Sequence, residues 1–283
     1  MLLLLASAAL ASWPDDINLS QLAVKGDTAV LDPADNVQVY ETVLRELGAA
    51  IANKPMYGAD SLGPDGFEVG VMTTIGFHSA GTDEIGEYAP WERVDADGEA
   101  SDVLLVPWIM VRKGILPSLD VGANMGWVGL SRQSALGGYA RFSPLEGYHN
   151  APDLAFQLGY SGYVGNNELE LGVMDWSGTL SYSLPFGALQ GINNARFTPF
   201  AGVGQIIMHG QPRLSDEQNA DLGLRAISGF ENSDAYDAND PQWRQLQVHA
   251  GFMMVNRGFH FRAGTVWTPA IMPTINLGIG FTY

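Results

Sequence analysis

The sequence predicts an all-β fold, a transmembrane antiparallel up-and-down β-barrel of about ten strands preceded by one α-helix. Three observations lead to this prediction. From residue 66 onward, apolar residues recur at every second position, in runs of about 10–14 residues. The face opposite the apolar one carries Gly, Asn, Gln, Thr and His rather than Lys and Glu. Strands in globular sheets average about 5–6 residues, whereas membrane strands need about 9–11, so a membrane barrel is favoured over a soluble sandwich.

The alternation divides the chain into ten predicted strands, because successive side chains of a strand point to opposite faces. The strands cover residues 66–79, 103–112, 116–130, 134–143, 152–163, 168–183, 196–208, 244–255, 258–268 and 273–283. Single-chain bacterial barrels have even strand numbers, so eight and twelve strands are the alternatives.

Two segments precede the predicted barrel of residues 66–283. Residues 1–11 form a short apolar run that ends in Ala-Leu-Ala, which is typical of a secretory signal peptide cleaved before Ser12. Residues 12–65 contain one helical pattern and form an N-terminal helical segment, expected in the periplasm or in the barrel lumen.

The helix is predicted from apolar residues at helical spacing, with Pro55 after the last turn. Asp35 or Asn36 is expected to cap its first turn. The apolar stripe consists of Val37, Tyr40, Val43, Leu44, Leu47 and Ile51. Either it packs against the protein's own surface or interior, or it acts as a plug or a partner-binding helix.

The longest connections predict which barrel end faces outward. Residues 80–102 and 209–243 follow the first and seventh predicted strands, so both lie on the same end, as outer loops do in bacterial barrels. Aromatic residues are expected at both membrane interfaces. Trp127, Trp243 and Trp267 would form the outer girdle, and Phe281 and Tyr283 the inner one.

Charge is distributed unevenly along the 283 residues. The chain carries 14 Lys+Arg and 31 Asp+Glu, giving a net charge of −17, and contains no Cys. The loops 80–102 and 209–243 contribute −7 and −5, residues 12–65 contribute −6, and the remainder is near neutral. This acidity argues against nucleic-acid binding, and the lack of Cys excludes disulfides and thiolate chemistry. The longest apolar run, Met1–Ala11, is too short for a membrane-spanning helix.

The lumen is the first candidate functional site. Alternation directs a set of polar residues inward. Side chains can fill the interior of a barrel of eight strands, and a barrel of ten strands is only slightly wider. Either these residues pair for structure in a filled interior, or they line a narrow polar passage. The candidate lumen residues are Glu68, Asp120, Asn124, Arg141, Glu168, Glu170, His249, His260 and Arg262.

Catalytic and metal chemistry have little support in the sequence, and no cofactor is expected. His78, His209 and the pair Asp83-Glu84 fall near the outer strand ends, as in omptin-type barrel proteases, but no omptin-like motif surrounds them. Acidic loops can bind divalent cations, yet residues 95–98 supply only a fragment of a calcium loop, and a solvated loop is the expectation.

The last strand carries a family resemblance. Ile275, Leu277, Ile279, Phe281 and the terminal Tyr283 alternate as in the C-terminal strand of Gram-negative outer-membrane β-barrels. The stretches 196–204 and 259–264 also resemble strands of small barrels of this class, including a group with a helix before the first strand. The resemblance covers residues 66–283. It implies an outer-membrane location, lipid as a partner and recognition of the last strand by the barrel-assembly machinery.

Two functions follow as hypotheses. The first is passive transport of small solutes through a monomeric barrel. The second is a non-conducting structural or surface-interaction barrel that acts through its acidic outer loops. An enzymatic function is not expected.

Overall fold

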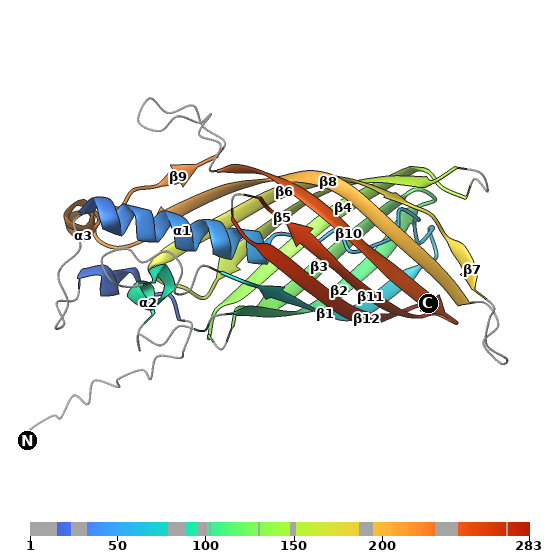
Figure 1. Ribbon diagram of the computed structural model, residues 1–283, viewed down its shortest axis with the longest axis horizontal. Helices are drawn as coiled ribbons and strands as arrows, with labels where there is room; N and C mark the ends of the chain where they lie inside the picture. The colour runs from blue at the N-terminus through green and yellow to red at the C-terminus, as the bar shows by residue number, and fades with distance from the viewer. Residues whose placement is uncertain are drawn as a thin grey trace, which may run out of the picture.

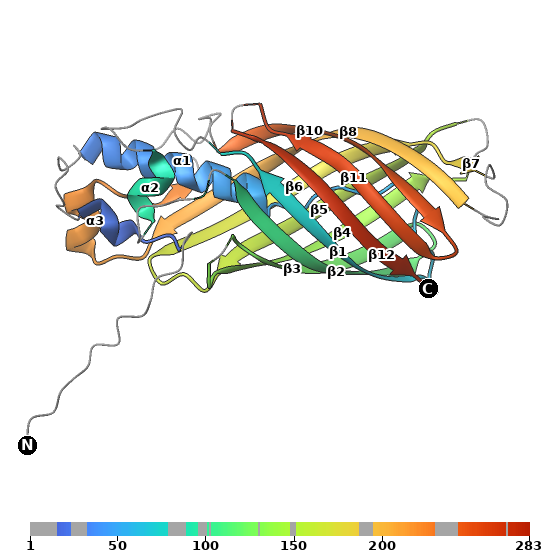
Figure 2. The same ribbon diagram turned by 60° about the horizontal axis from the view of Figure 1, so that its bottom comes forward.

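Ten antiparallel strands close into a barrel (Figures 1 and 2). The computed structural model describes residues 16–23, 33–78, 89–95, 101, 103–129, 131–147, 151–186, 195–229, 243–269 and 271–283. The strands are β1 (Phe67–Gly76), β2 (Leu104–Leu116), β3 (Leu119–Trp127), β4 (Ser134–Leu145), β5 (Asp153–Val164), β6 (Leu169–Ser181), β8 (Ala195–Pro212), β10 (Arg244–Asn256), β11 (Phe259–Trp267) and β12 (Pro273–Thr282).

Neighbours in sequence are neighbours in the barrel, which gives the predicted up-and-down topology. Two pairings complete the closure: β1 with β12, from Glu68↔Thr282 to Gly76↔Thr274, and β8 with β10. Two short strands lengthen the sheet along β8. β7 (Leu184–Phe186) pairs with its first residues, and β9 (Ile227–Ser228) pairs with His209 and Gly210. The prediction of a ten-stranded antiparallel barrel is confirmed.

The two ends of the barrel differ. At one end, which we call the turn end, only two residues join β2 to β3 and two join β10 to β11. The C-terminus lies there, because Tyr283 exchanges backbone hydrogen bonds with Phe67 at the start of β1. The opposite end, which we call the cap end, carries the long connections 77–103 and 213–243.

Helices gather at the cap end in the described part of the chain (Figure 1). They are η1 (Leu19–Ala23, a 3-10 helix), α1 (Pro33–Ile51), α2 (Pro90–Val94) and α3 (Asp216–Leu222), and we refer to them together as the cap. None of the helices in the described residues is both long enough and apolar enough to cross a membrane.

Five of the six residues of the predicted apolar stripe of α1 are buried, and Val37 is half-buried; the buried ones are Tyr40, Val43, Leu44, Leu47 and Ile51. The helix begins at Pro33, so Asp35 and Asn36 lie in its first turn and the expected capping by them is not formed. Proline suits the first helical position because its missing N–H would have no helical partner. The last turns of α1 enter the barrel mouth. There, Gly48 lies against Met208, and Leu44 lies against Gly210.

Side chains of the wall alternate between an apolar outer face and the barrel interior. The outward residues of β12, Ile275, Leu277, Ile279 and Phe281, are exposed, whereas Thr274 and Asn276 are buried. A closed sheet with an outward apolar face satisfies every backbone group without an edge, which is the requirement for crossing a bilayer with strands.

Candidate functional site

The bore of the barrel is occupied by the protein's own chain. Residues 52–62, which we call the plug, leave the end of α1 and run toward the turn end, where β1 begins (Figure 1). Most of the plug is buried, including Ala52, Met56, Tyr57 and Ala59. Residues 52–62 show no periodic pattern in the sequence, and the position of this segment follows only from its contacts with the wall.

The upper part of the plug is anchored by Asn53. Its backbone N and side-chain Nδ2 both donate to Asp175 Oδ2, at 3.3 and 2.7 Å, and its Oδ1 accepts from Asn124 Nδ2 at 2.8 Å. Two wall glycines make room for it. A Cβ on Gly159 would lie 2.5 Å from Asn53 Nδ2, and one on Gly137 would lie 2.9 Å from Asn53 Oδ1. The wall and the plug are therefore complementary in shape at Asn53.

The middle of the plug is Tyr57, whose ring is contacted by three arginines of the wall. The Cζ atoms of Arg262, Arg112 and Arg141 lie 4.4, 4.5 and 5.9 Å from the ring centroid. Cations over an aromatic face are attracted by its quadrupole, more strongly where water is excluded. Arg141 Nη2 also donates to the Gly58 carbonyl oxygen, so the plug backbone supplies one hydrogen-bond acceptor to this buried guanidinium.

Acidic residues of the wall balance these arginines. Glu68 Oε1 lies 3.2 Å from Arg262 Nη1 and 3.3 Å from His260 Nε2, and all three side chains are almost fully buried. Asp120 Oδ2 lies 3.4 Å from Arg112 Nη2. Because isolated buried charges are very costly, this pairing makes the interior tolerable for ionised groups.

The lower part of the plug is fixed near the turn end. Ser61 N and Oγ donate to the two oxygens of Glu146, at 2.7 and 3.0 Å. Leu62 N donates to Asp120 Oδ1 at 3.1 Å, and Asp60 forms an ion pair of 2.8 Å with Arg196. The plug is therefore bonded along its whole length.

The structure places seven of the nine candidate lumen residues inside the barrel, where they pack against the plug or one another. These are Glu68, Asp120, Asn124, Arg141, His249, His260 and Arg262, each buried. His249 Nε2 is 3.0 Å from Thr179 Oγ1. Three residues of this arrangement were not predicted from the sequence: Arg112 and Asp175 of the wall, which contact the plug, and Tyr57 of the plug itself. Arg112 lies two residues after Met110 on the inward face of β2, so alternation alone predicts that it points into the barrel.

The other two candidates lie elsewhere. Glu170 is on the outer wall, paired with Arg213 at 2.5 Å, because β6 turns Leu169 and Leu171 inward and leaves the alternate position outside. Glu168 lies in the connection before β6, where it accepts hydrogen bonds from Ser20 N and Oγ at 2.8 and 2.7 Å. Its contact is with the cap rather than with the bore.

The aromatic residues near the interfaces divide in a similar way. Trp127 and Trp267 at the cap end, and Phe281 and Tyr283 at the turn end, point outward and are exposed. Trp243 does not join the outer girdle: it is 3% exposed and belongs to the buried apolar cluster. It shares its parity with Gln245 and Gln247, which face the interior, so alternation sends it inward.

The outer and inner faces of the barrel determine the class of protein. The closed antiparallel sheet of this chain has an apolar outer face, outward aromatic residues at both ends and a polar interior. The chain is a transmembrane β-barrel.

The chain is similar to several solved structures, at low sequence identity and low TM-score. No protein-family model and no curated protein matches this chain. Similar solved structures include LpxR from Salmonella typhimurium, at 9% identity and a TM-score of 0.34 over 77% of this chain and 99% of that one. The KdgM porin shares 3% identity, with a TM-score of 0.32, over 76% and 99%. The attachment invasion locus protein Ail of Yersinia pestis shares 9%, with a TM-score of 0.26, over 77% and 99%.

Histidines suggested as rim residues do not converge in this barrel. The ring of His209 stacks on Tyr160 on the outer wall, and His78 lies beside Trp91 under the cap. Asp83 and Glu84 lie outside the described residues, as do most of 80–102 and residues 230–242 of the second acidic loop. Within the described residues there is no group of three or more His, Cys, Asp or Glu side chains that could hold a metal ion.

Proposed function

We propose that this protein is an outer-membrane barrel that its own plug closes to solutes, and that it acts through surface interactions of its cap and acidic loops. The observation that supports this proposal is the occupied bore. Asn53 bonds to the wall at one end of the plug and Ser61 at the other, with the ring of Tyr57 against arginines between them. A conducting barrel needs an aqueous route along its axis, and the plug occupies that route.

The orientation in the membrane is part of this proposal. Bacterial barrels keep short turns in the periplasm and long loops outside. The turn end, with Tyr283, would then face the periplasm, and the cap end would face the cell exterior. In this orientation α1 lies at the outer mouth rather than in the periplasm, and its last turns are luminal. Recognition of the C-terminal strand by the barrel-assembly machinery belongs to the same proposal.

Passive transport of small solutes is the second candidate. It is favoured by the charged side chains on the bore wall, among them Glu68, Asp120 and Arg141, which would line a polar passage if the plug moved. The two candidates therefore differ in whether the plug leaves the bore.

Conductance in planar bilayers separates the candidates. We expect no steady current from the intact chain, and a clear rise for the triple variant Asn53→Gly, Tyr57→Gly and Ser61→Gly, because removing these three side chains leaves space for water and ions beside the plug backbone. A steady ohmic current from the intact chain overturns the closure and favours transport. If a chain without residues 12–65 is also silent while it still migrates as a folded barrel, passive transport is excluded.

Surface exposure of the cap is tested by thiol labelling, because the chain has no native cysteine. Glu217→Cys places an exposed thiol on α3 at the cap end, and Ala151→Cys places one at the turn end. On intact Gram-negative cells, a membrane-impermeant maleimide should label the first variant and spare the second until the outer membrane is opened. The reverse pattern contradicts the orientation.

A further inference from the structure

Three arginines of the wall point into the bore beside the plug, and one of them has no acidic side chain bound to it. Arg262 pairs with Glu68 at 3.2 Å. Arg112 pairs with Asp120 at 3.4 Å. Arg141 is only 1% exposed, yet within the described residues no carboxylate oxygen lies within 4.0 Å of its guanidinium nitrogens. A positive charge is therefore buried there without a direct counterpart.

The acids in the neighbourhood of Arg141 are paired with other arginines. Asp60 and Asp120 both act on Arg141 electrostatically. However, Asp60 forms its ion pair with Arg196 at 2.8 Å, and Asp120 forms its own with Arg112. Arg112 also repels Arg141. The two acids thus lower the cost of burying Arg141 without binding its guanidinium.

The guanidinium of Arg141 has unused hydrogen-bond donors. It extends from β4 to the plug, where Nη2 donates to the Gly58 carbonyl oxygen. Nε and Nη1 are buried and have no hydrogen-bond partner in the described part of the chain. Buried donors nearly always have a partner, so a further acceptor is expected at these nitrogens.

The plug lies against β6 and β8 at the point where Arg141 reaches it. Ala59 N donates to Ser181 Oγ on β6 at 2.7 Å. A Cβ on Gly58 would lie 2.8 Å from Thr198 Cγ2 on β8. Arg141 therefore ends between the plug and a part of the wall that is distant from its own strand.

His249 of β10 lies near this end of Arg141. Its Nε2 is 3.0 Å from Oγ1 of Thr179, which precedes Ser181 by two positions on the inward face of β6. Arg141 is close enough to act on His249 electrostatically. When Thr179 donates to Nε2, the neutral imidazole carries its proton on Nδ1. That nitrogen is buried and has no partner among the described residues, so it is a second unused donor.

The buried charges of the bore leave one positive charge over. Three arginines face two acids, and the further buried cation interacts with the further buried acid. The arginines are Arg112, Arg141 and Arg262, the two acids are Glu68 and Asp120, and the remaining pair is Lys54 and Asp175. A guanidinium does not lose its proton in proteins, and an uncompensated buried charge is very costly. The compensating charge has to come from outside these residues.

We propose that Arg141 binds one small monovalent inorganic anion of the halide kind, enclosed between the plug and the wall, a proposal that rests on the occupied bore. Arg141 donates to the anion through Nε or Nη1, and His249 donates through Nδ1. A single negative charge balances the excess. A phosphate or sulfate carries more charge and more acceptor oxygens than these donors satisfy. The anion adds a link between the plug and the wall, because Arg141 also holds the Gly58 carbonyl.

Refolding in the presence of bromide tests this site, because an enclosed anion has to enter as the barrel closes. The purified full chain is refolded in detergent with sodium bromide or sodium gluconate at equal ionic strength. The midpoint of thermal unfolding should rise by several degrees with bromide and then level off, since a ligand that binds only the folded state stabilises it. X-ray fluorescence after gel filtration should count one bromide per folded chain. If no bromide is retained, water solvates Arg141 and the proposal is wrong.

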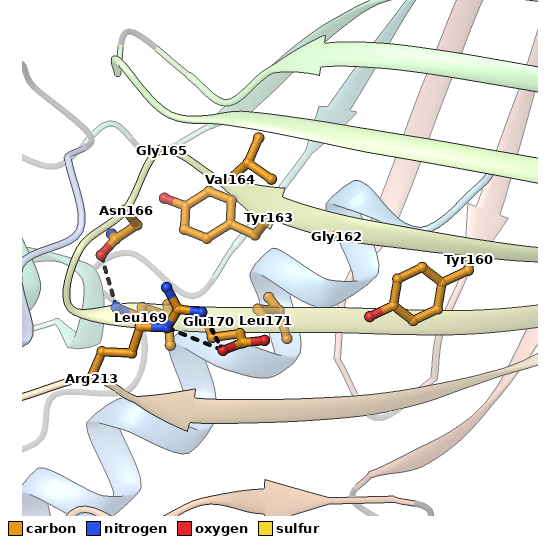
Figure 3. A pocket seen from close by; sticks show the side chains of 10 residues that line it. All are labelled: Tyr160, Gly162, Tyr163, Val164, Gly165, Asn166, Leu169, Glu170, Leu171 and Arg213. Carbon is orange, nitrogen blue, oxygen red and sulfur yellow. Dashed lines mark hydrogen bonds and ion pairs between the residues drawn. The ribbon is translucent and has the colours of Figure 1, made fainter.

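A matched pair of arginine variants locates the bromide. Arg141→Gln removes the buried charge and should abolish both the retained bromide and the dependence of the midpoint on bromide. Arg213→Gln is the control on the outer wall, where Nη2 and Nε of a half-exposed arginine donate to Glu170 Oε2 at 2.5 and 3.1 Å (Figure 3). This variant should keep one bromide per chain. One bromide retained by Arg141→Gln overturns the assignment, and the count for the parent chain decides the proposal even if that variant does not fold.

Failure of the proposed closure has a different signature. A steady current from the intact chain would contradict the closed bore, whereas the bromide count is made in detergent and depends on neither current nor orientation. A barrel that is silent in bilayers but retains no bromide overturns only the anion site.

Discussion

The ring of Tyr57 lies 4.4 Å from the guanidinium carbon of Arg262 and 4.5 Å from that of Arg112. The ring belongs to the plug and the two arginines to different strands of the wall. The arginines also pair with Glu68 and Asp120, so one aromatic side chain joins the plug to an electrostatic network that crosses the bore.

Replacing this ring should loosen the plug. Tyr57→Leu keeps an apolar side chain but removes the aromatic face, and each cation–π contact contributes about 0.5–2 kcal/mol. We expect the free energy of unfolding in detergent to fall by about 1–3 kcal/mol for the contacts together, measured by tryptophan fluorescence during denaturant titration. Tyr182→Leu, at an exposed position, is the control. Equal effects in the two variants would contradict the assigned role of Tyr57.

Two adjacent glycines of β4 provide a test of the fit between plug and wall. Gly137 faces inward, and a Cβ there would lie 2.1 Å from Asn124 Oδ1 and 2.9 Å from Asn53 Oδ1. Gly138 faces outward, with its closest atom at 3.5 Å. Gly137→Val should cost about 1–3 kcal/mol through overpacking, whereas Gly138→Val should stay within about 0.5 kcal/mol of the parent. Thermal unfolding followed by heat-modifiable gel migration measures both, and similar midpoints would argue against an occupied bore.

Glu68 is expected to be much more sensitive to substitution than the half-exposed Glu170. Glu68→Gln leaves Arg262 without its anionic partner in the interior, and breaking a buried pair costs about 3–5 kcal/mol. Glu170→Gln breaks the half-exposed pair with Arg213, which is worth about 0–1 kcal/mol. Denaturant titration of both variants should show this difference. A loss for Glu68→Gln as small as that for Glu170→Gln would mean that the interior is well hydrated.

The first described segment, residues 16–23, should be held less tightly against the connection between β5 and β6 when Glu168 is truncated. Glu168→Ala removes the acceptor of two hydrogen bonds from Ser20. Hydrogen exchange should become faster in residues 16–23, while the strands keep their protection, because local opening does not require unfolding of the barrel. Glu217→Ala, on the exposed face of α3, should leave the exchange of this segment unchanged. Faster exchange throughout the strands would instead indicate that the barrel depends on the cap.

The strands could be predicted from sequence because their signal is local. Two-residue alternation in β12 identifies its outward face from Ile275 to Phe281 without knowledge of any partner. The same rule explains two of the three side chains that lie elsewhere than predicted. Trp243 has the inward parity of Gln245, and Glu170 has the outward parity of Trp176. In both cases the phase of the residue in the strand, and not its chemical type, decides the side on which it lies.

The contents of the bore could not be predicted in this way. The plug has no period, and its partners are distant in sequence: Asn53 and Asp175 are 122 residues apart, and Glu68 and Arg262 are 194 apart. A glycine such as Gly159 indicates space in a wall, but not what occupies that space. Only the closed barrel brings these groups together.

Strand β1 starts at the turn end, whereas α1 sits at the cap end, and the chain between them runs through the bore. While β1 stays paired with β12, residues 52–62 cannot swing aside, because Phe67 holds one end and the cap holds the other. Emptying the bore therefore requires pulling the whole N-terminal portion through it or opening the β1–β12 seam. This has a consequence for biogenesis: the segment must already lie along the axis when the first and last strands join, so the barrel folds around its own leading chain.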